Sequence, residues 1–267
     1  MNQPLHQSGK SRLVAVINAA GDIIQIGDVE VTLTIPRTKA AKLLSRWTSQ
    51  GWLRRVGPGA YVLVELALHD SERVIQDPWV LVPPLFNPAY IGGFTAAEHW
   101  DLTEQIFRDI LVFTSRPVRK VTIESQGTVF SLKHIKQELI FGTRTVWRGQ
   151  SRVMVSDIHR TIIDMLNDPA IGGGIQHVSD CFAQYMQRKD NDLHCLVEYA
   201  ERLGNGAVFK RLGFLAERHG RADILTDAAK LRLTKGHAKL DPALNCEKLI
   251  TRWRLRVPAS WTKRKRE

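Results

Sequence analysis

The stretch IPRTKAAKLLSRWTSQGWLRRVGPGAYVLV, residues 35–64, predicts a helix followed by a β-hairpin. Pro36 suits the first turn of a helix, where the N–H that proline lacks has no partner anyway, and the helix is expected to end near Gly51. Apolar side chains recur along it at spacings of three and four residues, which places them on one face: Ala40, Leu43, Leu44 and Trp47. We expect this face, together with Trp52, to fill a small core.

The predicted hairpin spans residues 52–64, with its turn at Gly57-Pro58-Gly59. Upstream, the apolar positions predict a first helix over residues 11–20 and a short second helix over residues 27–33. The order helix, helix, helix, hairpin is that of a winged helix-turn-helix, in which the hairpin is the wing. We therefore expect residues 1–66 to form a DNA-binding domain of this type.

The charge of the chain points to a polyanionic partner. Its 38 Lys and Arg residues against 27 Asp and Glu residues give a formal net charge of +11 and a pI near 9.8, and such a field attracts phosphate groups. Residues 35–60 contain six Lys or Arg residues and no Asp or Glu. Because the major groove of B-DNA admits an α-helix, we expect the polar face of the predicted helix to enter it.

The candidate DNA-binding residues lie on this helix and on the hairpin, and they are Arg37, Thr38, Lys39, Lys42, Ser45, Arg46, Arg54 and Arg55. Arg37, Thr38 and Lys42 are assigned to base edges, and Lys39 and Arg46 to phosphates. The two wing arginines would brace the DNA backbone. The base and phosphate roles can be exchanged among these residues, and a simply solvated face is the alternative for any run of cations.

Residues 67–267 are expected to form a larger mixed α+β domain whose C-terminal part is helical. A short helix over residues 77–82 should stop at Pro83-Pro84, and Thr95 should cap the next helix. Strand-like runs bounded by Pro, Gly and Ser lie at residues 110–114, 120–123 and 138–141. Helical patterns lie at residues 156–166, where Ser156 can cap, and at 175–188, 193–203 and 207–218.

Several classes of protein are disfavoured by the sequence. There is no run of 18 or more apolar residues and residues 1–10 lack the features of a secretory signal, so we expect a cytoplasmic protein without membrane contact. Cys181, Cys195 and Cys246 lack the spacing of a zinc site or a disulfide framework, so no metal or other cofactor is expected. The basic tail, residues 248–267, is either a solvated terminus or a second phosphate-binding surface.

A nucleic-acid-processing enzyme, with a winged helix that only delivers a catalytic domain, is the rival function. Its best candidate site is a set of residues that would suit metal-dependent phosphotransfer, namely Asp157, His159, Asp164 and Asp168. On a helix, however, a side chain two residues after Asp157 points elsewhere. Residues 172–174 are three glycines, but they lack the lysine and the Ser or Thr of a P-loop. We therefore expect no enzymatic activity, and we expect these carboxylates to cap helices or to be structural.

Three segments, in order along the chain, resemble the AbiEi family of antitoxins, the transcriptional regulators of type IV abortive-infection toxin-antitoxin systems. They are residues 42–61 of the predicted winged helix, YIGGFTAAE at residues 90–98, and SDIHRTIIDML at residues 156–166. The resemblance implies an N-terminal domain that binds repeats in its own promoter. It also implies that residues 67–267 form an antitoxin domain that counteracts a toxin resembling nucleotidyltransferases.

Overall fold

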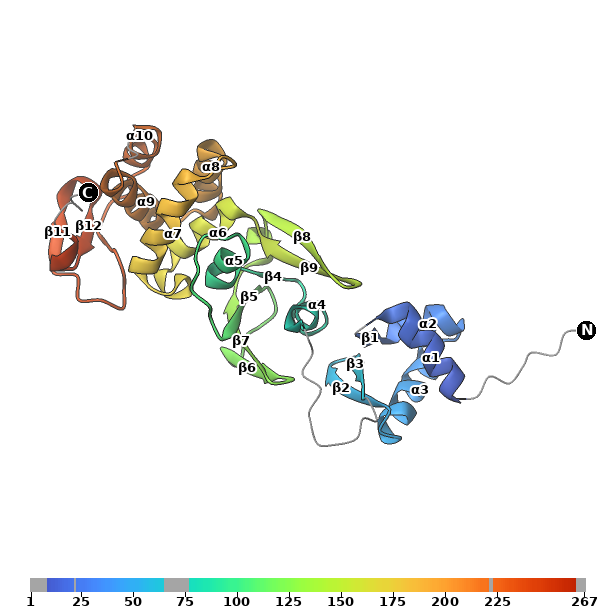
Figure 1. The fold of residues 1–267 in the computed structure, drawn as a ribbon. Coiled ribbons are helices and arrows are strands. Elements are labelled where there is room, and N and C mark those ends of the chain that lie inside the picture. The colour runs from blue at the N-terminus through green and yellow to red at the C-terminus, as the bar shows by residue number, and fades with distance from the viewer. Residues whose placement is uncertain (1–8, 22, 65–76, 221–222, 263–267) are drawn as a thin grey trace, which may run out of the picture.

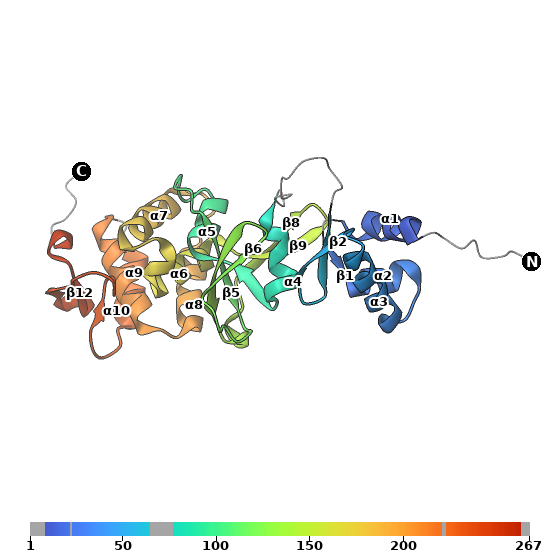
Figure 2. The same cartoon turned by 90° about the horizontal axis from the view of Figure 1, so that it is seen from below.

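The computed structural model describes residues 9–21, 23–64, 77–220 and 223–262 (Figure 1). The protein is a mixed α+β protein with three sheets in these residues. From both viewing directions the N-terminal helices lie at one end and the last strands at the opposite end (Figures 1 and 2). The six-stranded sheet and the helices of residues 158–218 lie between these two ends.

The N-terminal part contains three helices and a small sheet. The helices are α1 (Gly9–Ala20), α2 (Ile26–Leu33) and α3 (Arg37–Ser49), and the strands are β1 (Ile24–Gln25), β2 (Leu53–Gly57) and β3 (Ala60–Leu63). The strands pair antiparallel in the order β1-β3-β2. Thr34 ends α2 in the left-handed conformation, and the extended residue Pro36 precedes α3, so the two helices are joined by a sharp turn.

The core of this part is built on the apolar face predicted for α3. Ala40, Leu44 and Trp47 are at most 1% exposed and pack with Val16 of α1 and Val29 of α2. Trp52 also packs against this cluster, partly buried. The sequence predictions of the helix, of the hairpin and of the core tryptophans are confirmed.

The middle of the chain forms a six-stranded mixed sheet in the order β6-β7-β5-β4-β9-β8. Its strands are β4 (Ala89–Ile91), β5 (Asp109–Thr114), β6 (Thr122–Ser125), β7 (Thr128–His134), β8 (Thr143–Arg148) and β9 (Ser151–Ser156). Pairing is parallel between β5 and β7 and between β4 and β9, and antiparallel elsewhere. Three shorter elements accompany it: the 3-10 turn η1 (Pro78–Leu81), α4 (Val82–Phe86) and α5 (Gly93–His99).

The C-terminal part is helical up to residue 231 and ends in a small sheet. Its helices are α6 (Ile158–Asn167), α7 (Ile175–Gln187), α8 (Leu193–Leu203), α9 (Gly206–Arg218) and α10 (Asp223–Leu231). The strands are β10 (Ala238–Lys239), β11 (Lys248–Ile250) and β12 (Leu255–Val257), with β12 in the centre. Helix α6, which is buried from Ile158 to Leu166, lies in the largest hydrophobic cluster, and this cluster joins the helices to Trp253 and Val257.

The hairpin and the six-stranded sheet share a hydrophobic cluster. Ile23, Ala60 and Val62 from the N-terminal part pack with buried residues of η1, α4 and the sheet, among them Val80 and Phe86. Gly57 is so close to the Leu85 side chain that an added Cβ would lie 2.2 Å from it. The hairpin is therefore held against the second part of the chain on one side.

Several local predictions for the second part of the chain are wrong. Pro83 and Pro84 lie in the first turn of α4, which begins at Val82, instead of stopping a helix, because this turn does not need their missing N–H groups. Thr95 does not cap α5, since the helix starts at Gly93 and the Thr95 hydroxyl accepts a hydrogen bond from Leu111 N at 2.9 Å. Ser156 ends β9, and Asp157 caps α6 by accepting from Arg160 N at 2.8 Å.

The strand expected at residues 138–141 does not form, although the structure describes these residues. Residues Gln137–Leu139 form a 3-10 turn, and Phe141 is a buried side chain with the guanidinium carbons of Arg160 and Arg202 each 4.0 Å from its ring centroid. The apolar side chains of this run therefore pack in the interior, and the run does not pair with a strand. By contrast, the helices expected at 175–188, 193–203 and 207–218 are confirmed as α7, α8 and α9.

Candidate nucleic-acid interface

The face of α3 opposite the core carries most of the candidate DNA-binding residues. Successive residues of a helix are turned by about 100° around its axis. Relative to Ala40, Leu44 and Trp47, which are buried, the centre of the outer face is formed by Thr38, Lys42 and Ser45. All three of these side chains are exposed. This central stripe is the part of α3 that a DNA groove would meet first.

Lys39, Arg46 and Arg37 flank the central stripe. Lys39 and Arg46 are exposed on one side, where they suit contact with a phosphate backbone. Arg37 lies on the other side, and its Nη1 donates to Glu30 Oε2 of α2 at 3.2 Å. Because Arg37 is 71% exposed, this ion pair contributes little to stability and can be exchanged for another anion. On this geometry Arg37 lies at the flank of the central stripe and not within the stripe that would contact base edges.

The N-terminus of α3 adds backbone donors to the same side of the molecule. Pro36 is the N-cap residue and no side chain caps the helix. The first N–H groups of an α-helix have no partner within the helix and carry partial positive charge, which suits them to a phosphate group. Arg37 and Thr38 supply the first of these N–H groups, beside their own exposed side chains.

The two arginines of the hairpin differ in their surroundings. Arg55 is exposed, and its Nε donates to Gly57 O at 3.1 Å, which holds the side chain along the hairpin. Arg54 is half-buried and donates through Nη2 to the side chain of Gln126, in the turn between β6 and β7. Arg55 is thus presented to solvent as the sequence suggested, whereas Arg54 is engaged with the second part of the chain.

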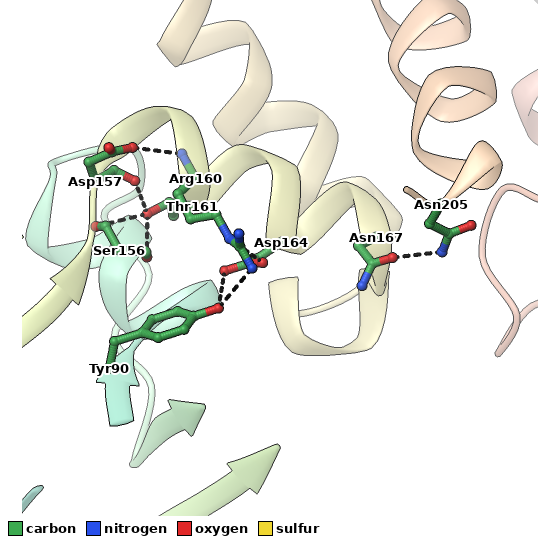
Figure 3. Close-up of polar contacts among 8 residues, drawn as sticks. All are labelled: Tyr90, Ser156, Asp157, Arg160, Thr161, Asp164, Asn167 and Asn205. Carbon is green, nitrogen blue, oxygen red and sulfur yellow. Dashed lines mark hydrogen bonds and ion pairs between the residues drawn. The ribbon is translucent and has the colours of Figure 1, made fainter. Parts of the chain in front are cut away.

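One of the carboxylates considered for an enzymatic site, Asp164, lies in a buried structural network with Tyr90 and Arg160 (Figure 3). Asp164 accepts from Arg160 Nε at 2.9 Å and from the Tyr90 hydroxyl at 3.0 Å. The Arg160 and Asp164 side chains are 0% and 1% exposed. Burial raises the pKa of Asp164 to about 6, although Arg160 and Tyr90 act in the opposite direction. Burial also raises the pKa of the Tyr90 hydroxyl well above its usual range.

The remaining members of that set have separate partners. Asp157 caps α6 and accepts from the Tyr199 hydroxyl at 2.9 Å, and His159 Nδ1 lies 2.8 Å from the Tyr185 hydroxyl. Asp168 pairs with Lys133 Nζ at 2.6 Å. Among the described residues, no three His, Cys, Asp or Glu side chains are grouped so that they could hold a metal ion. The four residues therefore do not form one site.

Tyr90 is a member of this network that the sequence does not predict. The spacing of Arg160 and Asp164, four residues apart on one helix, was a readable sign of an ion pair. Tyr90 comes from β4, 74 residues away from Asp164, and only the packing of β4 against α6 brings the two groups together. Two segments that are far apart in the sequence, residues 90–98 and 156–166, meet in this network (Figure 3).

A solved structure has a fold similar to that of this protein. No protein-family model matches the chain, and no curated protein matches it in sequence. The crystal structure of the RV2827C protein from Mycobacterium tuberculosis is similar, with a TM-score of 0.61 and 14% sequence identity, over 94% of this chain and 92% of that chain. The same arrangement of elements thus recurs over nearly the full length of both chains. In the described part of this chain, no helix is long and apolar enough to cross a membrane.

Proposed function

We propose that this protein binds duplex DNA sequence-specifically, through a winged helix-turn-helix formed by its N-terminal residues. The observation that carries the proposal is the outer face of α3. It presents cations and hydroxyl groups to solvent, within a stretch, residues 35–60, that has no carboxylate. Its opposite face is buried, so the helix is held rigidly while this outer face stays accessible. A helix of this kind fits the major groove.

The proposed contacts follow the position of each side chain on α3 and the hairpin. Thr38, Lys42 and Ser45 read base edges from the central stripe. Lys39, Arg46 and Arg37 hold phosphates from its two flanks, and the first N–H groups of the helix add to them. Arg55 contacts the backbone from the wing.

We further propose, from the resemblance to the AbiEi family, that the protein represses its own promoter and acts as the antitoxin of a type IV toxin-antitoxin system. Its DNA target is then a set of repeats upstream of its own gene. Residues 67–267 counteract a nucleotidyltransferase-like toxin. The proposal rests on the resemblance of the three sequence segments named above; two of these segments contact each other through Tyr90, Arg160 and Asp164. No cofactor is required for this function.

The test of DNA recognition is a salt titration of binding, measured by fluorescence anisotropy on the DNA upstream of the gene and on a scrambled duplex. Lys42→Ala is expected to weaken binding to the upstream DNA by about 1–3 kcal/mol and to reduce its preference over the scrambled duplex. Arg46→Ala is expected to weaken binding to both duplexes equally and to reduce the salt slope by about 0.9.

The matched control is Arg119→Gln/Lys120→Gln, which removes two exposed cations from the loop before β6. This variant should retain the preference for upstream DNA. Equal, steeply salt-dependent binding of the wild type to both duplexes would contradict sequence-specific recognition. The antitoxin role is tested separately: co-expression with the product of a neighbouring nucleotidyltransferase-like gene should restore growth, and unrestored growth would contradict that role.

A further inference from the structure

The small sheet at the C-terminal end carries a second group of exposed cations. We call it the C-terminal basic surface and define it by Lys235, Lys239, Arg254 and Arg256, all of which are exposed. Residues 230–262 contain eight Lys or Arg residues and two acidic residues, Asp241 and Glu247. This surface lies at the opposite end of the molecule from α1, α2 and α3 (Figures 1 and 2).

The fold brings these cations together against their mutual repulsion. Lys239 of β10 and Arg256 of β12 are direct neighbours in the register of two parallel strands, so they share one face of the sheet. Arg256 lies between the buried Leu255 and Val257, and Lys239 precedes the buried Leu240, so this face is the outer one. At the adjoining edge, Arg254 Nη1 donates to Thr234 O at 3.1 Å and Lys210 Nζ donates to Gly236 O at 3.0 Å. Like charges side by side on neighbouring strands cost stability. An anion bound across them would remove that cost.

The two carboxylates nearby in sequence do not neutralise this surface. Asp241 is 3% exposed and accepts from Ile175 N at 3.0 Å and Ala243 N at 2.9 Å, so it is used inside the fold. Glu247 accepts from Asn245 at 2.7 Å, and no ion pair of the described residues joins it to one of the four cations. The ion pairs observed in the described residues do not include Lys235, Lys239 or Arg256. The surface therefore presents uncompensated charge to solvent.

The aromatic side chains near these cations indicate which kind of polyanion the surface suits. Trp253 and Trp261 are 1% and 7% exposed, and residues 230–262 contain no Phe or Tyr. Single-stranded nucleic acids are usually held by exposed aromatic side chains that stack on bases. A cationic surface without such rings suits a regular phosphate backbone. We propose that the C-terminal basic surface binds the backbone of duplex DNA without reading its sequence, so that the chain has a DNA-binding surface at each end.

The test uses the full-length chain with α3 disabled by Lys42→Gln/Arg46→Gln, so that binding to a scrambled duplex reports the other surface. Adding Lys239→Gln/Arg256→Gln is expected to weaken this binding by about fivefold or more at low salt. It should also reduce the slope of log affinity against log salt by about 1.8, because two phosphate contacts are lost. All four side chains are exposed, and unchanged thermal unfolding of the variant verifies its folding.

The matched control adds Arg119→Gln/Lys120→Gln to the same background and is expected to leave the affinity and the slope unchanged. An equal loss in this control, or no loss with Lys239→Gln/Arg256→Gln, would overturn the proposal. So would a loss confined to single-stranded RNA or to anionic lipid vesicles, both measured in parallel. The outcome does not depend on recognition by α3: a wild type with no preference for upstream DNA contradicts the proposed function and leaves this comparison intact.

Discussion

Replacing Arg160 by methionine should destabilise the protein by an amount that grows with pH. The substitution leaves the Asp164 carboxyl, which is 1% exposed, without its cation. Breaking a buried ion pair by removing one partner costs about 3–5 kcal/mol. Burial already raises the pKa of Asp164 to about 6, and Arg160 is the first of the groups that oppose this rise. Without Arg160 that pKa rises further.

The sign of the pH effect follows from the raised pKa. The carboxyl of the unfolded chain has a pKa near its ordinary value of 3.8, so the stability contributed by protonated Asp164 is complete below that pH and falls as the pH rises. In the wild type this decrease in the free energy of unfolding ends near pH 6, where the carboxyl of the folded protein ionises. In Arg160→Met the decrease continues above pH 6, because the folded carboxyl stays protonated. The difference in free energy of unfolding between the two proteins therefore grows by about 1.4 kcal/mol for each pH unit above 6.

The assay is urea unfolding followed by tryptophan fluorescence at pH 5, 6, 7 and 8. Arg202→Met is the control, because Arg202 is exposed and lies at the same 4.0 Å from the Phe141 ring as Arg160 does. It should lose about 0.5–1 kcal/mol at every pH, the contribution of an exposed cation–π contact. A difference between wild type and Arg160→Met that stays constant from pH 6 to pH 8 would contradict the expected further rise in the pKa of Asp164.

Three further substitutions test the packing that supports the fold, each by urea unfolding at pH 7. Tyr90→Phe removes the hydroxyl that donates to Asp164 and should cost about 1–3 kcal/mol, whereas a change below about 0.5 kcal/mol would mean that the bond is not formed. Gly213→Ala places a Cβ 2.1 Å from the ring of Trp253 and should cost about 1–3 kcal/mol; unchanged stability would contradict this close approach. Asp192→Ala removes the cap that accepts from two N–H groups of α8 and should cost about 0.5–2 kcal/mol, with the exposed Asp180→Ala as the comparison.

The long helices of this protein are readable from the sequence because their signals are local. The apolar spacing of α3 and the start of α8 after Asp192 lie within a few residues, and both helices form where the spacing indicates. The outer face of α3 was equally predictable, since it follows from the buried face. The hydrogen bond of Arg54 was not predictable, because its partner Gln126 lies 72 residues away and only the packing of the hairpin against the six-stranded sheet brings them together.

The strands of the second part were harder to predict. β8 is an edge strand without a fully buried position, and the strands of the C-terminal sheet have two or three residues each, which is too short for an alternation to be recognised in the sequence. The apolar run ending at Phe141 looked like a strand, yet the ring is needed between two guanidinium groups. In each case a partner distant in sequence decides the conformation.

The hydrophobic cluster shared by the hairpin and the six-stranded sheet bears on how this protein can be engineered. A fragment that ends at residue 64 would expose Ile23, Ala60 and Val62 to water, although they are at most 6% exposed in the full chain. Exposed apolar patches of this kind promote self-association. The N-terminal helices and the hairpin therefore cannot be moved into a fusion protein by themselves. Such a fusion needs η1 and α4 as well, or polar residues in place of Ile23, Ala60 and Val62.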